Sequence, residues 1–181
     1  CLDDLVGQEK IVRRIKLLRE KGGLQGRVFW LVGESGTGKT SAARIIAAET
    51  ADPYAVIEKD AQEFTMDFVR ELERMCQFKP IGEKMCHVFI CNEAHRLSDR
   101  VVSRLQTVLE EPQVQRNSTW IFTTTNRGQR ALFDDKFDAC PFLSRATVLE
   151  FESRGSELEL AFAVHVRKIA QAEGCDGRPL E

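Results

Sequence analysis

A short apolar run that leads directly into a glycine-rich loop decides the fold: Val28-Phe29-Trp30-Leu31-Val32-Gly33-Glu34-Ser35-Gly36-Thr37-Gly38-Lys39-Thr40. The continuous apolar residues predict a strand buried on both faces, and the Ala- and Ile-rich residues after the loop predict a helix. Between them, residues 33–40 match the pattern G-x-x-x-x-G-K-S/T in full, in the strand–loop–helix context that this pattern requires. The complete match disfavours the alternative, a glycine turn that carries Lys-Thr by coincidence.

Each part of this loop has a chemical reason to bind a triphosphate. Backbone N–H groups of residues 36–40 point at phosphate oxygens, and the helix N-terminus adds partial positive charge. Lys39 is expected to reach the β- and γ-phosphates, and the Thr40 hydroxyl to take a place on magnesium. The predicted ligand is therefore ATP with Mg²⁺, bound by Gly33, Glu34, Ser35, Gly36, Thr37, Gly38, Lys39 and Thr40.

Strands and helices alternate along the rest of the chain. Apolar and β-branched runs predict strands, and apolar residues at three- to four-residue spacing predict helices. The predicted strands are Val28–Val32, a weak candidate at Ala55–Ile57, His87–Cys91, Thr119–Thr124 and Ala146–Phe151. The predicted helices are Gln8–Lys21, Lys39–Thr50, a segment carrying Phe64, Phe68, Leu72 and Met75, a segment from Ser98 to a stop at Glu111–Pro112, and Ser156–Ala172.

This order is typical of an α/β fold, a P-loop NTPase core whose five-stranded parallel sheet lies between helices. The sheet pattern ends near Phe151–Gly155, where a purely helical segment begins. We therefore expect an ATPase domain over residues 1–152 and the beginning of a helical lid domain over residues 153–181.

Polar residues follow two further strands, at the sheet edge where ligands bind in such folds. His87–Cys91 leads into Asn92-Glu93-Ala94-His95, and Glu93 is the candidate to polarise the attacking water. The alternative is an exposed carboxylate at a strand end. Asn92 occupies the place where an Asp would hold magnesium through its water shell, so metal binding should be weaker. His95 is expected to orient its neighbours, and Asn126 to hydrogen-bond the water or the γ-phosphate.

The composition sets limits on partners and location. The 181 residues are 43% hydrophobic and 30% charged, with a net charge of −2. This charge gives no global attraction to nucleic acid, although Arg96, Arg100 and Arg104 would form one basic face of a helix. A solvated face that pairs with carboxylates is the alternative. No apolar stretch has the length of a membrane span, and no signal peptide is recognisable, so we expect a cytoplasmic protein.

The six cysteines contain no C-x-x-C pair, and three lie in apolar segments, so buried reduced thiols are expected rather than a metal site. Because the sequence begins with Cys1 where Met would be expected, we expect the native chain to start further upstream.

These motifs together resemble the AAA+ ATPases, and within them the clamp-loader subunits of DNA replication (DNA polymerase III gamma/tau or replication factor C small subunits). Leu2–Glu9 looks like the adenine-pocket segment, which would place Val6 beside the adenine of ATP. Residues 33–40 match Walker A, and Asn92-Glu93-Ala94-His95 is similar to Walker B with its first residue changed. Thr107–Pro112 looks like the clamp-loader signature Thr-Leu-Glu-Glu-Pro, and Asn126 matches sensor 1.

Leu143-Ser144-Arg145-Ala146 resembles the clamp-loader Ser-Arg-Cys motif, with Ala146 replacing Cys. The resemblance implies that Arg145 is a finger that reaches the γ-phosphate bound by a neighbouring subunit. It further implies catalytic residues Glu93, Asn126 and Arg145, metal-binding residues Thr40 and Asn92, a ring of AAA+ subunits, a sliding clamp and primed DNA.

The implied function is an ATPase that couples ATP binding and hydrolysis to clamp loading on DNA, weakened by Asn92. Two alternatives stay open. One is another AAA+ machine, such as a branch-migration helicase or a helicase loader. The other is a non-hydrolysing ATP-binding scaffold or switch subunit, which Asn92 favours. The sensor 2 arginine and the C-terminal collar of the family are expected beyond residue 181.

Overall fold

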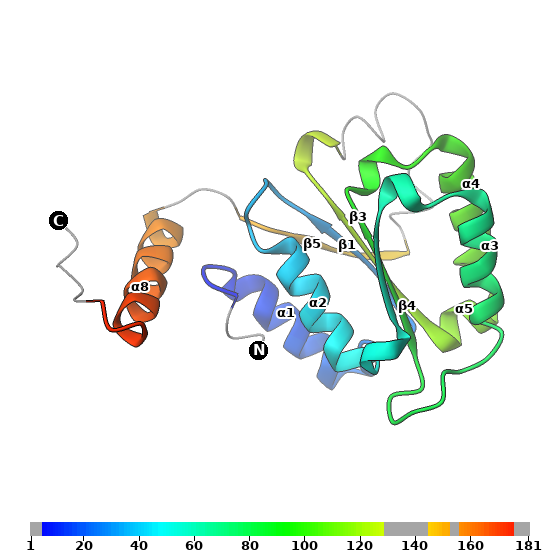
Figure 1. Cartoon of the computed structure of the whole chain (residues 1–181), viewed down its shortest axis with the longest axis horizontal. Helices are drawn as coiled ribbons and strands as arrows, with labels where there is room; N and C mark the ends of the chain where they lie inside the picture. Colours follow the sequence, from blue (N-terminus) through cyan, green and yellow to red (C-terminus); the bar gives the residue numbers. More distant parts are fainter. Residues whose placement is uncertain (1–4, 129–144, 153–155, 176–181) are drawn as a thin grey trace.

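The computed structural model describes residues 5–128, 145–152 and 156–175. Its helices and strands alternate as the sequence predicts (Figure 1). The strands are β1 (Val28–Val32), β2 (Val56–Asp60), β3 (His87–Asn92), β4 (Ser118–Thr124) and β5 (Ala146–Glu150). The longer helices are α1 (Glu9–Glu20), α2 (Lys39–Thr50), α3 (Met66–Met75), α4 (Asp99–Val108), α5 (Pro112–Asn117) and α8 (Ser156–Ala172), and short 3-10 turns η2 (Pro53–Ala55), η3 (Ala61–Glu63) and η4 (Ala94–Arg96) lie between them.

The five strands form one parallel sheet in the order β2-β3-β4-β1-β5, which confirms the predicted fold class. The register of β5 on β1 matters for the site. Val28 pairs with Ala146 and Val32 with Glu150, so the two parallel strands begin at the same level of the sheet and end at the same level. The glycine-rich loop therefore leaves the edge formed by the carboxyl ends of the strands.

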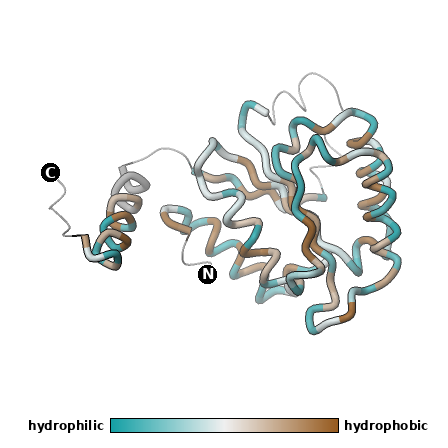
Figure 2. The backbone as a smooth tube through the Cα atoms, in the orientation of Figure 1, coloured by the Kyte–Doolittle hydropathy of each residue, from teal (hydrophilic) through white to brown (hydrophobic). Residues whose placement is uncertain are grey.

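Alternate strand residues point into two hydrophobic cores, one on each face of the sheet. Phe29 and Leu31 pack with α1 and α2, whereas Trp30 packs with α3, α4 and α5 on the other face. Both faces are covered, which explains why the strands read as continuous apolar runs (Figure 2). Aromatic rings link neighbouring strands in the second core, with Phe89 and Trp120 centroids 4.6 Å apart.

Three elements differ from the sequence prediction by more than one residue. Phe64 lies before α3, because Thr65 is the N-cap and its hydroxyl accepts from the Phe68 amide at 3.2 Å. The predicted helix from Ser98 ends at Val108, and Pro112 opens α5. Proline suits a first helical turn because its missing N–H has no partner there. The weak strand candidate is β2, which runs on to Asp60.

Helix α8 follows the sheet and stands apart from the layered core in Figure 1. Its described side chains include exposed apolar residues at Phe162, Val164, Val166 and Ile169. The division into an ATPase domain and the start of a lid, placed near residue 152, stays a prediction.

Candidate nucleotide-binding and hydrolysis site

The loop of residues 33–40 joins β1 to α2 in the conformation that its glycines were predicted to allow. Gly36 and Gly38 have φ values of 80° and 91°, in the left-handed region where a side chain is strained. Gly33 is needed for a different reason, since a Cβ there would lie 2.7 Å from the Cβ of Phe151. Gly38 is also the N-cap of α2, so the first amides of this helix have no side-chain partner and face the loop.

Lys39 is held inside this loop. Its Nζ donates to the Glu34 carbonyl at 2.6 Å, and the Thr37 hydroxyl donates to the same oxygen at 2.8 Å. The residue is only 7% exposed. Burial lowers the pKa of Lys39, and the nearby Glu93 carboxylate acts in the opposite direction. A phosphate group would supply a negatively charged hydrogen-bond partner for this buried ammonium.

The N-terminal segment is tied to the loop and to the end of β5. A Cβ on Gly38 would lie 3.7 Å from Leu5, and Val6 beside it is half-buried. Gln8, which is only 3% exposed, donates to the Glu152 carbonyl at 2.9 Å and accepts from the Glu152 amide at 3.2 Å. This pairing fixes the segment that contains Val6 beside the loop. Residues 2–4 of the predicted adenine-pocket segment lie outside the described residues.

A cleft of about 570 Å³ opens between α1 and the end of β5. That volume is in the range of small-ligand sites. Lys10 and Arg14 place two cations on it, and Lys10 pairs with Glu152 at 2.6 Å. The cleft is lined by Lys10, Ile11, Arg14, Asn126 and residues 148–152. Since Phe151 also contacts Gly33, the cleft adjoins the start of the phosphate loop.

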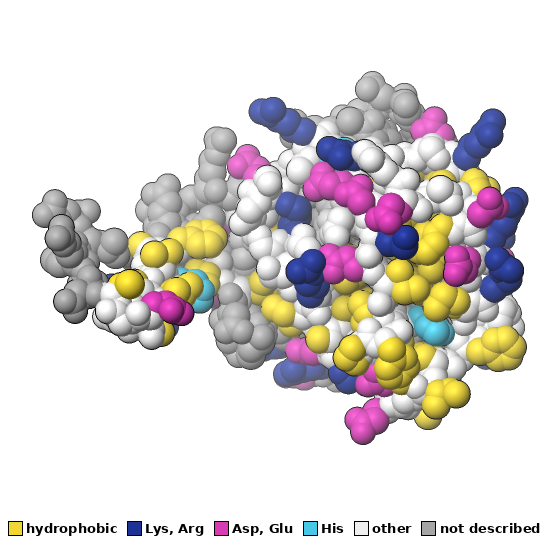
Figure 3. Space-filling model, viewed as in Figure 1, with side chains coloured by type: hydrophobic (Ala, Val, Ile, Leu, Met, Phe, Trp, Pro, Cys, Tyr) yellow, Lys and Arg dark blue, Asp and Glu magenta, His cyan; other side chains and the backbone are white. Residues whose placement is uncertain are grey.

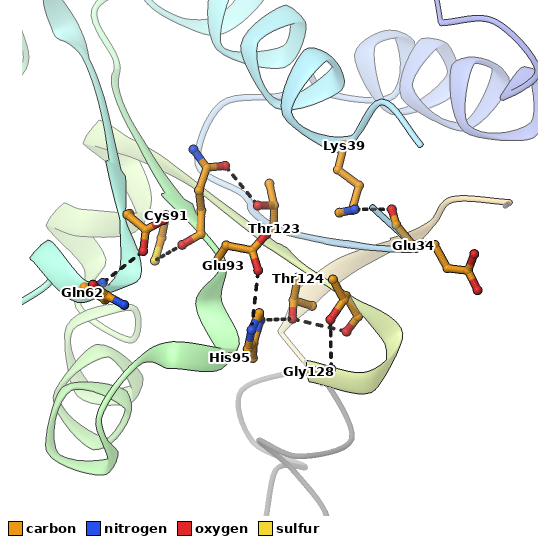
Figure 4. A network of polar contacts seen from close by, with 12 residues as sticks. Glu34, Lys39, Gln62, Cys91, Glu93, His95, Thr123, Thr124 and Gly128 are labelled. Carbon is orange, nitrogen blue, oxygen red and sulfur yellow. Dashed lines mark hydrogen bonds and ion pairs between the residues drawn. The ribbon is translucent and has the colours of Figure 1, made fainter. Parts of the chain in front are cut away.

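Glu93 leaves the end of β3 with φ at 54°, a left-handed conformation that is uncommon for residues other than glycine. Its carboxylate lies 3.5 Å from His95 Nε2, and His95 Nδ1 lies 3.2 Å from the Thr124 hydroxyl. His95 thus joins the candidate base to the end of β4, as its predicted orienting role requires. Figure 4 shows Lys39, Glu93, Thr123 and Thr124 gathered where β1, β3 and β4 end.

Asn92 has both ends of its side-chain amide engaged. Its Nδ2 donates to Glu58 at 2.8 Å, and its Oδ1 accepts from the Thr123 hydroxyl at 3.0 Å. The oxygen keeps a second lone pair. Thr40, Asn92 and Glu93 offer only oxygen ligands, which suits magnesium, a hard cation. The predicted metal roles of Thr40 and Asn92 therefore fit the chemistry of the donors.

Asn126 lies two residues beyond the end of β4 and is exposed. It lines the same cleft as the end of β5. The structure thus places it at the edge of the sheet that carries the loop and Glu93, which is where a residue that orients water would be needed.

Arg145 lies at the opposite edge. It directly precedes Ala146, which pairs with the first residue of β1, whereas the loop follows the last residue. Five strand residues separate the two edges, or about 16 Å at about 3.3 Å per residue. Arg145 forms an ion pair with Glu110 at 2.7 Å. Leu143 and Ser144, from the same predicted motif, lie outside the described residues.

Comparison with known proteins identifies this arrangement. Residues 29–139 match the family described as "ATPase family associated with various cellular activities (AAA)". The chain belongs to the AAA family. The match runs from β1 through the loop, Glu93 and Asn126. The narrower resemblance to clamp-loader subunits remains a prediction.

Solved structures share the fold of this AAA chain. A RuvB variant from Thermotoga maritima gives a TM-score of 0.69 at 21% identity, over 96% of this chain and 53% of that one. A structure described as a DNA replication initiation factor gives 0.67 at 15% identity, over 98% and 56%. The chain thus spans about half the length of these proteins. A comparison with curated protein sequences gave no match.

The predicted basic face of the AAA chain is only partly formed. Arg96 belongs to η4 rather than α4, and Arg104 forms an ion pair with Glu73 of α3. The pairing with a carboxylate is the alternative that the sequence left open. Figure 3 shows basic and acidic side chains interspersed over the described part of one face, without a large patch of one sign.

Three of the four cysteines in the described residues are buried. Cys76, Cys86 and Cys91 are free thiols in the interior, while Cys175 is exposed. Burial raises the pKa of Cys76 to about 11, so this thiol stays protonated. Within the described residues, no group of three or more His, Cys, Asp and Glu side chains is placed to hold a metal. No helix in that part of the chain has the length and apolar character needed to cross a bilayer.

Sequence reasoning missed three residues of the site. Gln8 lies in the segment that resembles the family's adenine pocket, but its own contact could not be predicted. Its partner, Glu152, is 144 residues away in the sequence. Glu58 carries no motif, and the only signal for Thr123 is its place in the polar strand end that leads to Asn126. Each contacts Asn92 from a neighbouring strand, which only the sheet order and register reveal.

Proposed function

We propose that this chain is an ATP-hydrolysing subunit of a ring-forming AAA machine that acts in DNA replication. The observation that carries the proposal is the placement of Lys39 and Glu93 at the same edge of the sheet, at the start of α2 and directly after β3 (Figure 4). A buried cation for the phosphates and a carboxylate for water are the two groups that hydrolysis requires.

Each residue then has a role in the reaction. The loop amides and Lys39 bind the triphosphate, and the segment around Val6 binds the adenine ring. Glu93 accepts a proton from the attacking water, which Asn126 orients. Thr40 and Asn92 would hold magnesium, which when bound neutralises charge on the phosphate oxygens. Arg145 compensates the charge that develops on the phosphoryl group in a neighbouring copy.

The finer role is that of a clamp-loader subunit, which acts on a sliding clamp and primed DNA. Glu110 and Arg145 support it. They come from the two segments that resemble clamp-loader motifs, residues 107–112 and 143–146, and their side chains form an ion pair. A branch-migration helicase is the main alternative, and the fold that the chain shares with RuvB is consistent with it. A non-hydrolysing switch subunit is the third reading, which the amide at Asn92 favours.

Stimulation of ATP turnover distinguishes these roles. We expect primed DNA together with the sliding clamp of the same organism to raise turnover by the full-length protein about tenfold, since binding of both partners would favour the closed ring. Four-way junction DNA and primed DNA alone serve as controls. Stronger stimulation by the junction would select the branch-migration reading, and an absence of turnover under every condition would select the switch subunit.

A mixing experiment tests Arg145 in trans. Arg145→Ala keeps its own loop but loses the finger, and Lys39→Ala keeps the finger but loses the loop. We expect each variant alone to be inactive and a 1:1 mixture to recover about a quarter of wild-type turnover, because random head-to-tail contacts pair an intact loop with an intact finger that often.

Arg116→Ala, at an exposed arginine in the last turn of α5, is the matched control and should retain full activity alone. A mixture that is as inactive as its components would show that Arg145 does not complete a neighbouring site.

A further inference from the structure

Four side chains form a continuous hydrogen-bonded chain between the helix that follows the phosphate loop and the sheet. Arg44 of α2 donates to both carboxylate oxygens of Glu58 on β2, with Nε–Oε2 at 2.8 Å and Nη2–Oε1 at 3.1 Å. Glu58 Oε1 also accepts from Asn92 Nδ2 at 2.8 Å, and Asn92 Oδ1 accepts from Thr123 at 3.0 Å. The chain thus joins the loop helix to three adjacent strands, since β2, β3 and β4 are neighbours in the sheet.

The direction of these bonds fixes what each position must carry. An ionised Glu58 can only accept, so Asn92 must present its NH₂ group on that side and its oxygen to Thr123. An aspartate at position 92 has no hydrogen to donate and would bring a second carboxylate against Glu58. The Asn92 amide therefore has a function that aspartate could not supply, because its NH₂ group donates to Glu58.

Arg44 contacts both oxygens of Glu58, which is the bidentate geometry that a guanidinium forms with a carboxylate. The Glu58 side chain is 25% exposed, and Thr123 is buried. Arg44 lies one helical turn after Thr40, so this carboxylate is connected to the helix that carries the predicted metal-binding hydroxyl.

We propose that Glu58 is a positioning residue of the ATP site and forms with Asn92 a matched carboxylate–amide pair, with the carboxylate on β2 and the amide on β3. The pair orients the Asn92 oxygen toward Thr123 and the edge of the sheet where the triphosphate would lie. Its effect on magnesium rests on the proposed ATPase function, whereas the pairing itself does not.

A reciprocal exchange in the nucleotide-free protein tests the pairing. We expect Asn92→Asp to lower Tm by about 4–8 °C, because it sets two carboxylates against each other in a half-buried site. Glu58→Gln should lower it by about 2 °C. The double variant restores one amide and one carboxylate, so its Tm should lie above that of Asn92→Asp alone. Asp67→Asn, at a 90% exposed ion pair on α3, is the control and should change Tm by about 1 °C or less.

The second readout is ATP affinity measured with a fluorescent ATP analogue in magnesium and in EDTA. Glu58→Gln should reduce the gain in affinity that magnesium provides by about threefold to tenfold, with affinity in EDTA unchanged, and the double variant should recover part of it. A double variant whose Tm and magnesium effect equal the sum of the two single changes would overturn the pairing. If wild-type protein binds no ATP, the proposed function fails, while the Tm comparison still decides the pairing.

Discussion

Replacement of Lys39 by alanine is expected to weaken ATP binding at least about a hundredfold. The Lys39 ammonium is buried in the loop, where it donates a hydrogen bond to the Glu34 carbonyl. Two or more charge-assisted hydrogen bonds to phosphate oxygens would be lost, at about 1.5–3 kcal/mol each. Since about 1.4 kcal/mol corresponds to a factor of ten, the loss reaches two orders of magnitude. Titration calorimetry with ATP and magnesium measures it.

Two controls separate lost contacts from lost folding. Lys21→Ala removes an exposed lysine at the C-cap of α1, far along the chain from the loop, and should leave affinity within about twofold. Because removal of a buried charge relieves its desolvation, Lys39→Ala should unfold at or above the wild-type temperature without nucleotide. Unchanged ATP affinity in a folded Lys39→Ala protein would refute the phosphate-binding role of the loop.

Replacement of Glu93 by glutamine is expected to reduce ATP turnover about a hundredfold to a thousandfold while changing ATP affinity only a few-fold. A positioned general base contributes about 10²–10⁴ in rate. Glutamine has nearly the same shape and can still contact His95, which lies 3.5 Å from the carboxylate, but it cannot take a proton from water. Single-turnover hydrolysis and equilibrium binding, measured on the same preparation, separate the two effects.

Glu63→Gln is the matched control for this substitution. Glu63 pairs with Lys59 on the surface, with 54% of its side chain exposed, and its loss should leave turnover within about twofold. If the Glu93→Gln protein hydrolyses ATP at the wild-type rate, the general base is a residue other than Glu93. In that case the strained backbone at Glu93 would need a different explanation.

The sequence predicts the fold and the first half of the site because both depend on local order. Residues 33–40 must form a phosphate loop once a buried strand precedes them and a helix follows. Glu93 and Asn126 follow strand ends, and parallel strands bring such ends to one edge of the sheet. These predictions need only the assignment of strands, which periodicity supplies.

The partners of the site residues could not be predicted in the same way. Glu58 lies on the strand with the weakest sequence signal, and its contact with Asn92 depends on β2 lying beside β3. A shift of the register by one residue would turn Glu58 to the other face of the sheet. The pairing of Arg104 with Glu73 likewise depends on how α3 packs against α4, so helical spacing alone suggested a continuous basic face instead.

The role proposed for Arg145 in a neighbouring site would restrict how copies of this chain assemble. The loop leaves one edge of the sheet and Arg145 stands at the other, about 16 Å away along β1 and β5. Under that proposal, a twofold symmetric dimer would need one self-complementary surface that spans this distance, because each arginine must meet the loop of the other copy at the same interface. A head-to-tail contact needs only one arginine and one loop at each interface. Such a contact leaves one unused loop and one unused arginine in every open chain, and only closure into a ring uses them all.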